Sequence, residues 1–198
     1  MQLINYVEVI ILVTFVIIVV IKGGELKRHV PRAVLDECIE LLRNTIGAPG
    51  NDFCIDEVLN YKFNANPYDE YLLNELCHDI LKHCGMRDFS VVVRLQEQEN
   101  RHIAGTYHSE DGVGIINIVR KPYALDFETK ATLTHECMHY FLRRRNIFYT
   151  DTLKNEWLTD VATVYMGFWP LMGDGYFKQG YLTTKDLKYV LRSIGKAK

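Results

Sequence analysis

The pattern His-Glu-x-x-His at residues 135–139 constrains this chain more than any other feature. It lies in an apolar-periodic segment, residues 131–142, which predicts a helix. Residues four apart in a helix lie on the same face, so His135 and His139 could bind one metal ion together, with Glu136 in reach of a water on that ion. In a strand, residues four apart would be separated by about 13 Å, too far to share an ion. The alternative is an amphipathic core helix that happens to carry two histidines.

Two carboxylates stand on the next helix that the pattern predicts, residues 152–169. Glu156 and Asp160 are four positions apart, so they share a face, where their charges repel unless a cation lies nearby. Apolar residues such as Leu158 and Val161 surround them, which argues against the alternative of a solvated acidic face. Either carboxylate could be a third metal ligand. The longer side chain favours Glu156, and Asp160 could then accept the free ring N–H of a ligand histidine.

The first motif followed by Asn-Glu-x-x-Thr-Asp at residues 155–160 resembles the gluzincin pattern of thermolysin-like peptidases. In its small size the chain is similar to the minimal gluzincins and the ImmA/IrrE-type metallopeptidases, in which a short sheet and a few helices carry the whole site. The resemblance covers roughly residues 95–164. It implies these roles: His135, His139 and Glu156 as zinc ligands, Glu136 as general base, and Asp160 as partner of a ligand histidine. Two departures are a shorter spacing from His139 to Glu156 than in thermolysin and the absence of any later histidine that could stabilise an oxyanion.

On this basis the sequence predicts a zinc metallopeptidase with one Zn²⁺ per chain, acting on a peptide or protein substrate. Glu136 would take a proton from a zinc-bound water, which then hydrolyses the peptide bond. The alternative is a zinc-containing, zincin-like interaction module that does not cleave. The intact Glu136 argues against that alternative, because a binding module needs the ligands but not the base.

An apolar run at residues 3–21 predicts a transmembrane helix of about 28 Å, close to the thickness of bilayer hydrocarbon. A cleaved signal peptide, the alternative, would have positive charge before the run and a small-residue cleavage site after it, and the chain has neither. The basic residues that follow the run are Lys22, Lys27, Arg28 and Arg32. The positive-inside rule then predicts a single-pass membrane protein, with an anchor and linker in residues 1–28 and a cytoplasmic catalytic domain in residues 29–198.

The rest of the pattern predicts an α+β, zincin-like domain with a small, mostly antiparallel sheet. Further helices are expected at residues 31–46, 56–63, 68–84 and 184–194, and strands at residues 89–95, 101–108 and 113–119. An edge strand, either residues 105–108 or 114–117, could pair with an extended substrate. Tyr107 or His108 could then reach the oxyanion, as could Tyr149 or Tyr165; the alternative is that they are ordinary structural residues.

Charge and cysteine usage add two expectations. The formal net charge is −2, so nothing points to nucleic acid as a partner. Five cysteines without framework spacing indicate reduced thiols. Cys77-His78 and His83-Cys84 could form a second metal cluster. However, Cys77 and Cys84 are seven apart on one apolar helix face, which favours buried core cysteines.

Overall fold

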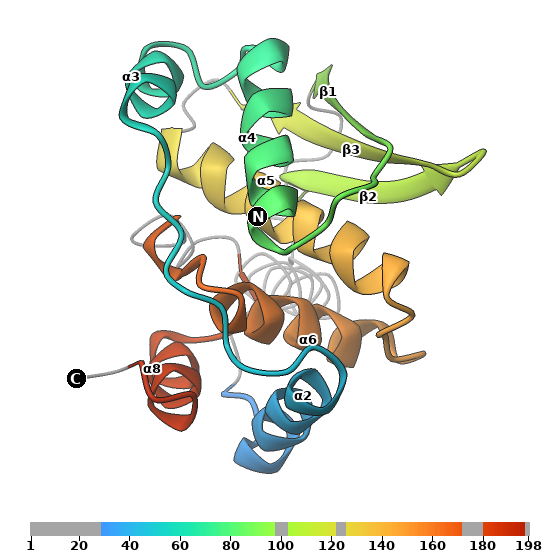
Figure 1. The fold of residues 1–198 in the computed structure, drawn as a ribbon, viewed down its shortest axis with the longest axis vertical. Helices are drawn as coiled ribbons and strands as arrows, with labels where there is room; N and C mark the ends of the chain where they lie inside the picture. The colour runs from blue at the N-terminus through green and yellow to red at the C-terminus, as the bar shows by residue number, and fades with distance from the viewer. Residues whose placement is uncertain (1–28, 98–102, 122–125, 172–179, 197–198) are drawn as a thin grey trace, which may run out of the picture.

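The computed structural model describes residues 29–97, 103–121, 126–171 and 180–196 (Figure 1). The elements follow in the order α2 (Arg32–Thr45), α3 (Glu57–Ala65), α4 (Glu70–His83), β1 (Val91–Glu97), β2 (Gly105–Glu110), β3 (Val113–Arg120), α5 (Asp126–Arg144), α6 (Thr152–Tyr165) and α8 (Thr184–Ser193). The predicted α+β class is confirmed, and each helix and strand predicted from periodicity in these residues is present within a few residues of its expected bounds.

Helix α5 runs through the middle of the fold (Figure 1). It contacts α4 and strands β2 and β3 on one side and α6 on the other, while α2 and α8 pack against α6. Nearly all of α5 between Glu128 and Leu142 is buried, so its polar side chains must find partners inside the fold. The His-Glu-x-x-His motif is therefore held between two packed layers.

The three strands are arranged in the order β1-β3-β2. Strand β1 pairs parallel with β3, and β2 pairs antiparallel with β3. The prediction of a mostly antiparallel sheet is therefore wrong, because the sheet is mixed. The two strands richest in β-branched residues, β1 and β3, pair with each other, and the more polar β2 takes the edge.

The two edge strands of this sheet, β1 and β2, differ in their neighbours. Side chains of α4 cover the outer edge of β1: Asn74 donates to the carbonyl oxygen of Val93 at 3.0 Å and accepts from its N–H at 2.9 Å. Glu70 also accepts from the N–H of Leu95 at 2.7 Å. Strand β2 forms the other edge, beside α5. Of the two strands considered as substrate edge, β3 is central and β2 is the edge.

The predicted transmembrane helix needs correction. No helix in the described part of the chain combines the length and the apolar character needed to cross a bilayer. Even α5, with 19 residues, has charged residues at both ends and Glu136 in its middle. The apolar run and the anchor assigned to residues 1–28 lie outside the described residues. The inferred localisation, a single-pass membrane protein with a cytoplasmic catalytic domain, is therefore not supported.

Helix α6 ends earlier than predicted, at Tyr165 rather than near residue 169. Gly167 has a φ of +91°, a left-handed conformation that glycine adopts without strain. Its backbone also passes so close to the carbonyl of Asn51 that a side chain at this position would clash. The chain therefore turns at Gly167 and packs on the segment that follows α2.

Candidate metal centre

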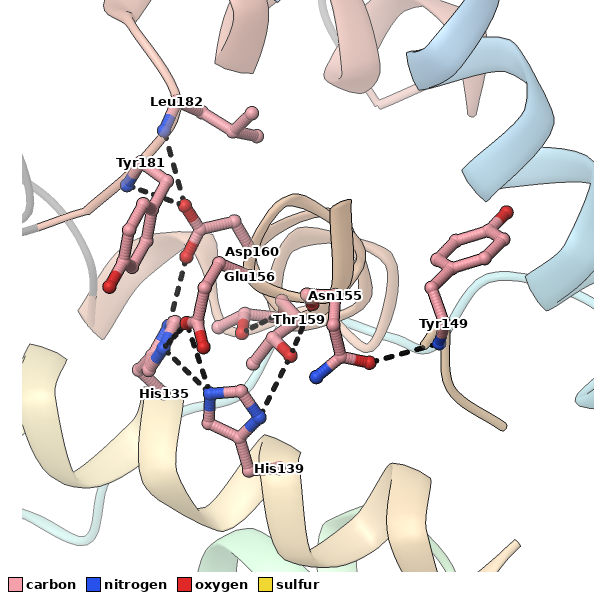
Figure 2. Close-up of polar contacts among 10 residues, drawn as sticks. His135, His139, Tyr149, Asn155, Glu156, Thr159, Asp160, Tyr181 and Leu182 are labelled. Atoms are coloured by element: carbon pink, nitrogen blue, oxygen red, sulfur yellow. Dashed lines mark hydrogen bonds and ion pairs between the residues drawn. The ribbon is translucent and has the colours of Figure 1, made fainter. Parts of the chain in front are cut away.

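Three side chains from α5 and α6 converge on one point (Figure 2). The Nε2 atoms of His135 and His139 are 3.1 Å apart, and Oε2 of Glu156 lies 3.1 Å from the first and 3.2 Å from the second. Atoms that bind a zinc ion tetrahedrally, each at about 2.0–2.1 Å, stand about 3.3–3.4 Å from one another. The three atoms are therefore close to the separation that a shared ion would impose.

Hydrogen bonds behind each imidazole fix which ring nitrogen carries the proton. Nδ1 of His135 lies 2.9 Å from Oδ1 of Asp160, and since an ionised carboxylate only accepts, Nδ1 is the donor. Nδ1 of His139 lies 3.1 Å from Oγ1 of Thr159, whose hydroxyl donates to the carbonyl oxygen of Asn155 at 3.0 Å. This nitrogen is therefore also a donor. In the neutral rings, both Nε2 atoms present lone pairs to the point of convergence.

This arrangement suits a cation. Two nitrogen lone pairs and a carboxylate oxygen repel one another at these distances unless positive charge lies among them. All three belong to residue types that bind divalent metal ions, and two are held by partners on their far side, as metal ligands in proteins usually are. His135, His139 and Glu156 thus form a group that could hold a metal ion.

The acid–base properties of the ligands indicate the same preference for positive charge. Burial lowers the pKa of His135, but hydrogen bonds to Asp160 and Glu156 outweigh burial and hold this pKa well above its ordinary value. Burial raises the pKa of Glu156, but hydrogen bonds that His135 and His139 donate from Nε2 when their rings are protonated bring it down to about 2. The site therefore stabilises a cation between its imidazoles and its carboxylate.

Asp160 connects the centre to the segment before α8. The residue is fully buried. While Oδ1 faces His135, Oδ2 accepts from the backbone N–H of Tyr181 at 2.7 Å and of Leu182 at 3.1 Å (Figure 2). Both carboxylate oxygens are thus engaged, and the imidazole of His135 has a fixed orientation.

Glu136 lies beside the group and lines the same cavity. Burial raises its pKa, although His135 and His139 act in the opposite direction. Strand β2 can lie against this part of α5 because residue 105 is glycine: a Cβ there would be 2.7 Å from Cγ2 of Thr132 and 3.1 Å from Cγ of Glu136. The edge strand and the carboxylate of Glu136 therefore border one space.

That space is a cavity of about 770 Å³. It is bordered by β2, by α5, by the turn at residues 147–149, by the first turns of α6 and by residues 180–181. Of the candidate oxyanion residues, Tyr107 and His108 line it from β2, and Tyr149 lines it from the turn. Tyr107 packs edge-on against Tyr140, the residue after His139 on α5, with ring centres 5.9 Å apart.

The remaining tyrosine candidates direct their hydroxyls elsewhere. The hydroxyl of Tyr149 donates to Glu37 of α2 at 3.1 Å. The hydroxyl of Tyr165 donates to the carbonyl oxygen of Gly47, and Tyr165 is not among the residues that line the cavity. Neither hydroxyl is therefore directed at the metal-binding group.

The structure adds Tyr181, which sequence reasoning missed. Its ring stacks on the imidazole of His135, with centres 6.1 Å apart and planes 25° from parallel, and it lines the cavity (Figure 2). No motif surrounds Tyr181 in the sequence. It reaches the site because Asp160 binds its backbone, a contact between residues 21 positions apart.

Asn155 belonged to the sequence motif but had no assigned role. Its Oδ1 accepts from the backbone N–H of Tyr149 at 3.1 Å, so its amide nitrogen must face the other way. Figure 2 shows this nitrogen on the side of His139, and Asn155 lines the cavity. The site therefore presents an oriented N–H donor next to the group that could hold a metal ion.

Comparisons of the chain with models of protein families, with curated proteins and with solved structures found no match. The gluzincin resemblance therefore remains a prediction from two short motifs.

Proposed function

We propose that this chain is a zinc-dependent peptidase. One observation carries the proposal: the ligand atoms of His135, His139 and Glu156 lie within 3.2 Å of one another, at the wall of a cavity that Glu136 also lines. A purely structural metal site has no need for a carboxylate beside the ligands or for access from a cavity of this size.

The donor set supports zinc as the ion. Two imidazoles and one carboxylate are a known set of three protein ligands for catalytic zinc, and they leave a fourth position open. Bound there, zinc would act as a Lewis acid on a carbonyl oxygen and lower the pKa of a water.

Glu136 is the proposed general base. Its carboxylate would take a proton from the attacking water and pass it to the leaving amine. A base that must accept and then release a proton near neutral pH works best when its pKa lies above the ordinary value for a carboxyl group. Burial shifts the pKa of Glu136 in that direction.

Tyr181 and Asn155 are the proposed hydrogen-bond donors. The phenol of Tyr181, held on His135, would donate to the negative charge that develops on the scissile carbonyl oxygen. Tyr181 would thus stabilise the oxyanion, a role that a later histidine has in thermolysin and for which this chain has no histidine after His139. The amide nitrogen of Asn155 would donate to a backbone carbonyl of the bound substrate.

Strand β2 is the proposed binding surface for the substrate backbone. Its inner edge pairs with β3, and the strand borders the cavity at Gly105, beside Glu136. An extended peptide could add to the outer edge as a fourth strand, with backbone hydrogen bonds that require little of its sequence. The other edge of the sheet is less suited, since Asn74 and Glu70 already bond to β1.

The full chain and its Glu136→Gln variant test the proposal together. Elemental analysis should find about one zinc per chain in both proteins, because Glu136 is not a ligand. Cleavage of a mixed peptide library should fall by roughly 10²–10⁴-fold in the variant, the usual contribution of general-base catalysis. Failure of the folded chain to take up zinc would refute the proposal. Zinc without cleavage by either protein would favour a non-cleaving module, and equal cleavage would exclude Glu136 as the base.

A further inference from the structure

A second set of polar groups lines the cavity about one turn of α5 beyond His139. Arg143 is exposed, lines the cavity, and places its guanidinium carbon 4.2 Å from the ring centre of Phe148, which lines the cavity too. Within the described part of the chain, Arg143 has no carboxylate at ion-pair distance. Stacking on the ring restricts the guanidinium plane, so less entropy is lost when its N–H groups bind a ligand.

Tyr107 of β2 contributes to the same corner of the cavity. Side chains alternate along a strand, so Tyr107 lies on the same side of β2 as Gly105, the side that faces α5. Tyr107, Arg143 and Phe148 all line the cavity. Burial and the neighbouring Tyr140 raise the pKa of the Tyr107 hydroxyl, while the positive charges of Arg143 and Arg144 act against that rise. We call Tyr107, Arg143 and Phe148 the Arg143 subsite.

The contacts between β2 and α5 indicate how far this subsite lies from the reacting bond. Gly105 lies against Glu136, and Tyr107 packs on Tyr140, so an advance of two residues along β2 corresponds to an advance of four residues along α5. Each of these advances covers about 6–7 Å. A peptide that extends along β2 has the same repeat. Its side chain two residues from the scissile bond would therefore point into the Arg143 subsite.

We infer that Arg143 and Tyr107 select substrates with an aspartate or glutamate about two positions to one side of the scissile bond. This inference rests on the proposed peptidase function. The guanidinium fork and the phenol are both donors, and a carboxylate accepts from both at once. The cavity-lining carboxylates, Glu136 and Glu156, lie at the metal-binding group rather than in this corner, so they do not neutralise Arg143.

The inference can be tested with the full, zinc-loaded chain and pairs of peptides. The two peptides of a pair differ only in having glutamate or glutamine at one position, either two residues before or two residues after the cleaved bond. For one of the two positions, kcat/KM should be roughly three- to tenfold higher for glutamate, the gain expected for a charge-assisted bond at a partly solvated site. Arg143→Gln should abolish that ratio, and Arg143→Glu should shift the preference to lysine.

Arg145→Gln is the matched control. It removes the same charge, and the guanidinium of Arg145 likewise lies over a ring, 4.9 Å from the centre of Phe141, but Arg145 does not line the cavity. The glutamate preference should therefore remain. Equal cleavage of both peptides by the wild type, or equal loss of preference in the Arg143 and Arg145 variants, would overturn the subsite.

Peptide binding separates failure of the subsite from failure of the peptidase proposal. Zinc-loaded Glu136→Gln protein, with and without Arg143→Gln, would be titrated with the same fluorescent peptides. A glutamate preference that depends on Arg143, in a protein whose wild type cleaves none of them, would leave the subsite standing and refute the peptidase. Cleavage without a glutamate preference in either rate or binding would refute the subsite and leave the peptidase proposal standing.

Discussion

Helices α4 and α5 each carry residues of the types that bind metals, yet only those of α5 converge on one point. His135 and His139 of α5 direct their Nε2 atoms at each other and at Glu156. On α4, Nε2 of His83 lies 3.1 Å from the carbonyl oxygens of both Asn51 and Met166. Two carbonyl acceptors require that this nitrogen carries a proton, so its lone pair is not available to a metal.

Cys77 of α4 and Cys84, the residue that follows this helix, are also engaged in packing. Cys77 and Cys84 are buried in the hydrophobic core, as predicted, and Sγ of Cys77 lies 3.4 Å from that of Cys137 on α5. Burial raises the pKa of Cys84 to about 12 and that of Cys137 well above its ordinary value. A thiol binds metals as the thiolate, so these thiols are poor ligands. Of these two helices, only α5 contributes histidines to a group that could hold a metal ion, because the corresponding side chains of α4 are occupied by other contacts.

The largest expected effect comes from removing a ligand. Glu156→Ala should lower zinc affinity by more than about 100-fold, beyond the usual effect of changing a residue that only supports a ligand. His83→Gln, the control on α4, should leave zinc affinity unchanged because His83 bonds to carbonyl groups. Competition with a chromophoric chelator measures both. A comparable loss in the His83 variant would mean that the two helices do not differ as the structure indicates.

A smaller effect is expected at Asp160, which holds His135 without being placed as a ligand. In Asp160→Asn, one amide oxygen must replace two carboxylate oxygens, and the amide nitrogen would face a donor, either His135 Nδ1 or the backbone of Tyr181 and Leu182. Zinc affinity or activity should fall by roughly 10–100-fold. If this variant bound no zinc while Glu156→Ala retained it, the two carboxylates would exchange roles.

Those parts of the molecule that depend on local sequence were predictable. Helix α5 and the placement of His135 and His139 on one face follow from a 3.6-residue period within a few turns. Glu156 and Asp160 share a face of α6 for the same reason. The turn between β2 and β3 also depends on local sequence: Asp111 and Gly112 both adopt a positive φ, as a two-residue type I′ hairpin turn requires, and Asp-Gly is a sequence that favours this turn.

Features that depend on contacts between distant segments were not predictable. The parallel pairing of β1 with β3 made the sheet mixed, and no local pattern distinguishes this pairing from an antiparallel one. The ring of Tyr181 stacks on His135 because Asp160 accepts a hydrogen bond from the backbone N–H of Tyr181. Tyr107 and Arg143 line one cavity because β2 lies against α5, an approach that Gly105 permits. The transmembrane helix was inferred from hydropathy alone, and no described helix has that character.

The smallest expected effect tests the neutral partner of the second histidine. Thr159 accepts from Nδ1 of His139, as Asp160 does from His135, but its hydroxyl oxygen carries no charge. Thr159→Val keeps the shape of the side chain but removes its bond to the carbonyl oxygen of Asn155 and its bond from His139. The bond from His139 is a neutral hydrogen bond, worth about 0.5–1.5 kcal/mol. Zinc affinity should therefore fall by roughly two- to tenfold, less than in Asp160→Asn.

Thr163→Val provides the matched control for this last comparison. Thr163 lies one turn further along α6, is fully buried, and donates to the carbonyl oxygen four residues back, as Thr159 does. Unlike Thr159, it forms no hydrogen bond with His135 or His139 within the described part of the chain, so its replacement should affect stability but leave zinc affinity unchanged. An equal fall in zinc affinity in both variants would assign the effect to α6 as a whole. A fall only in Thr159→Val would show that charged and neutral partners both orient the imidazoles, in proportion to the strength of their hydrogen bonds.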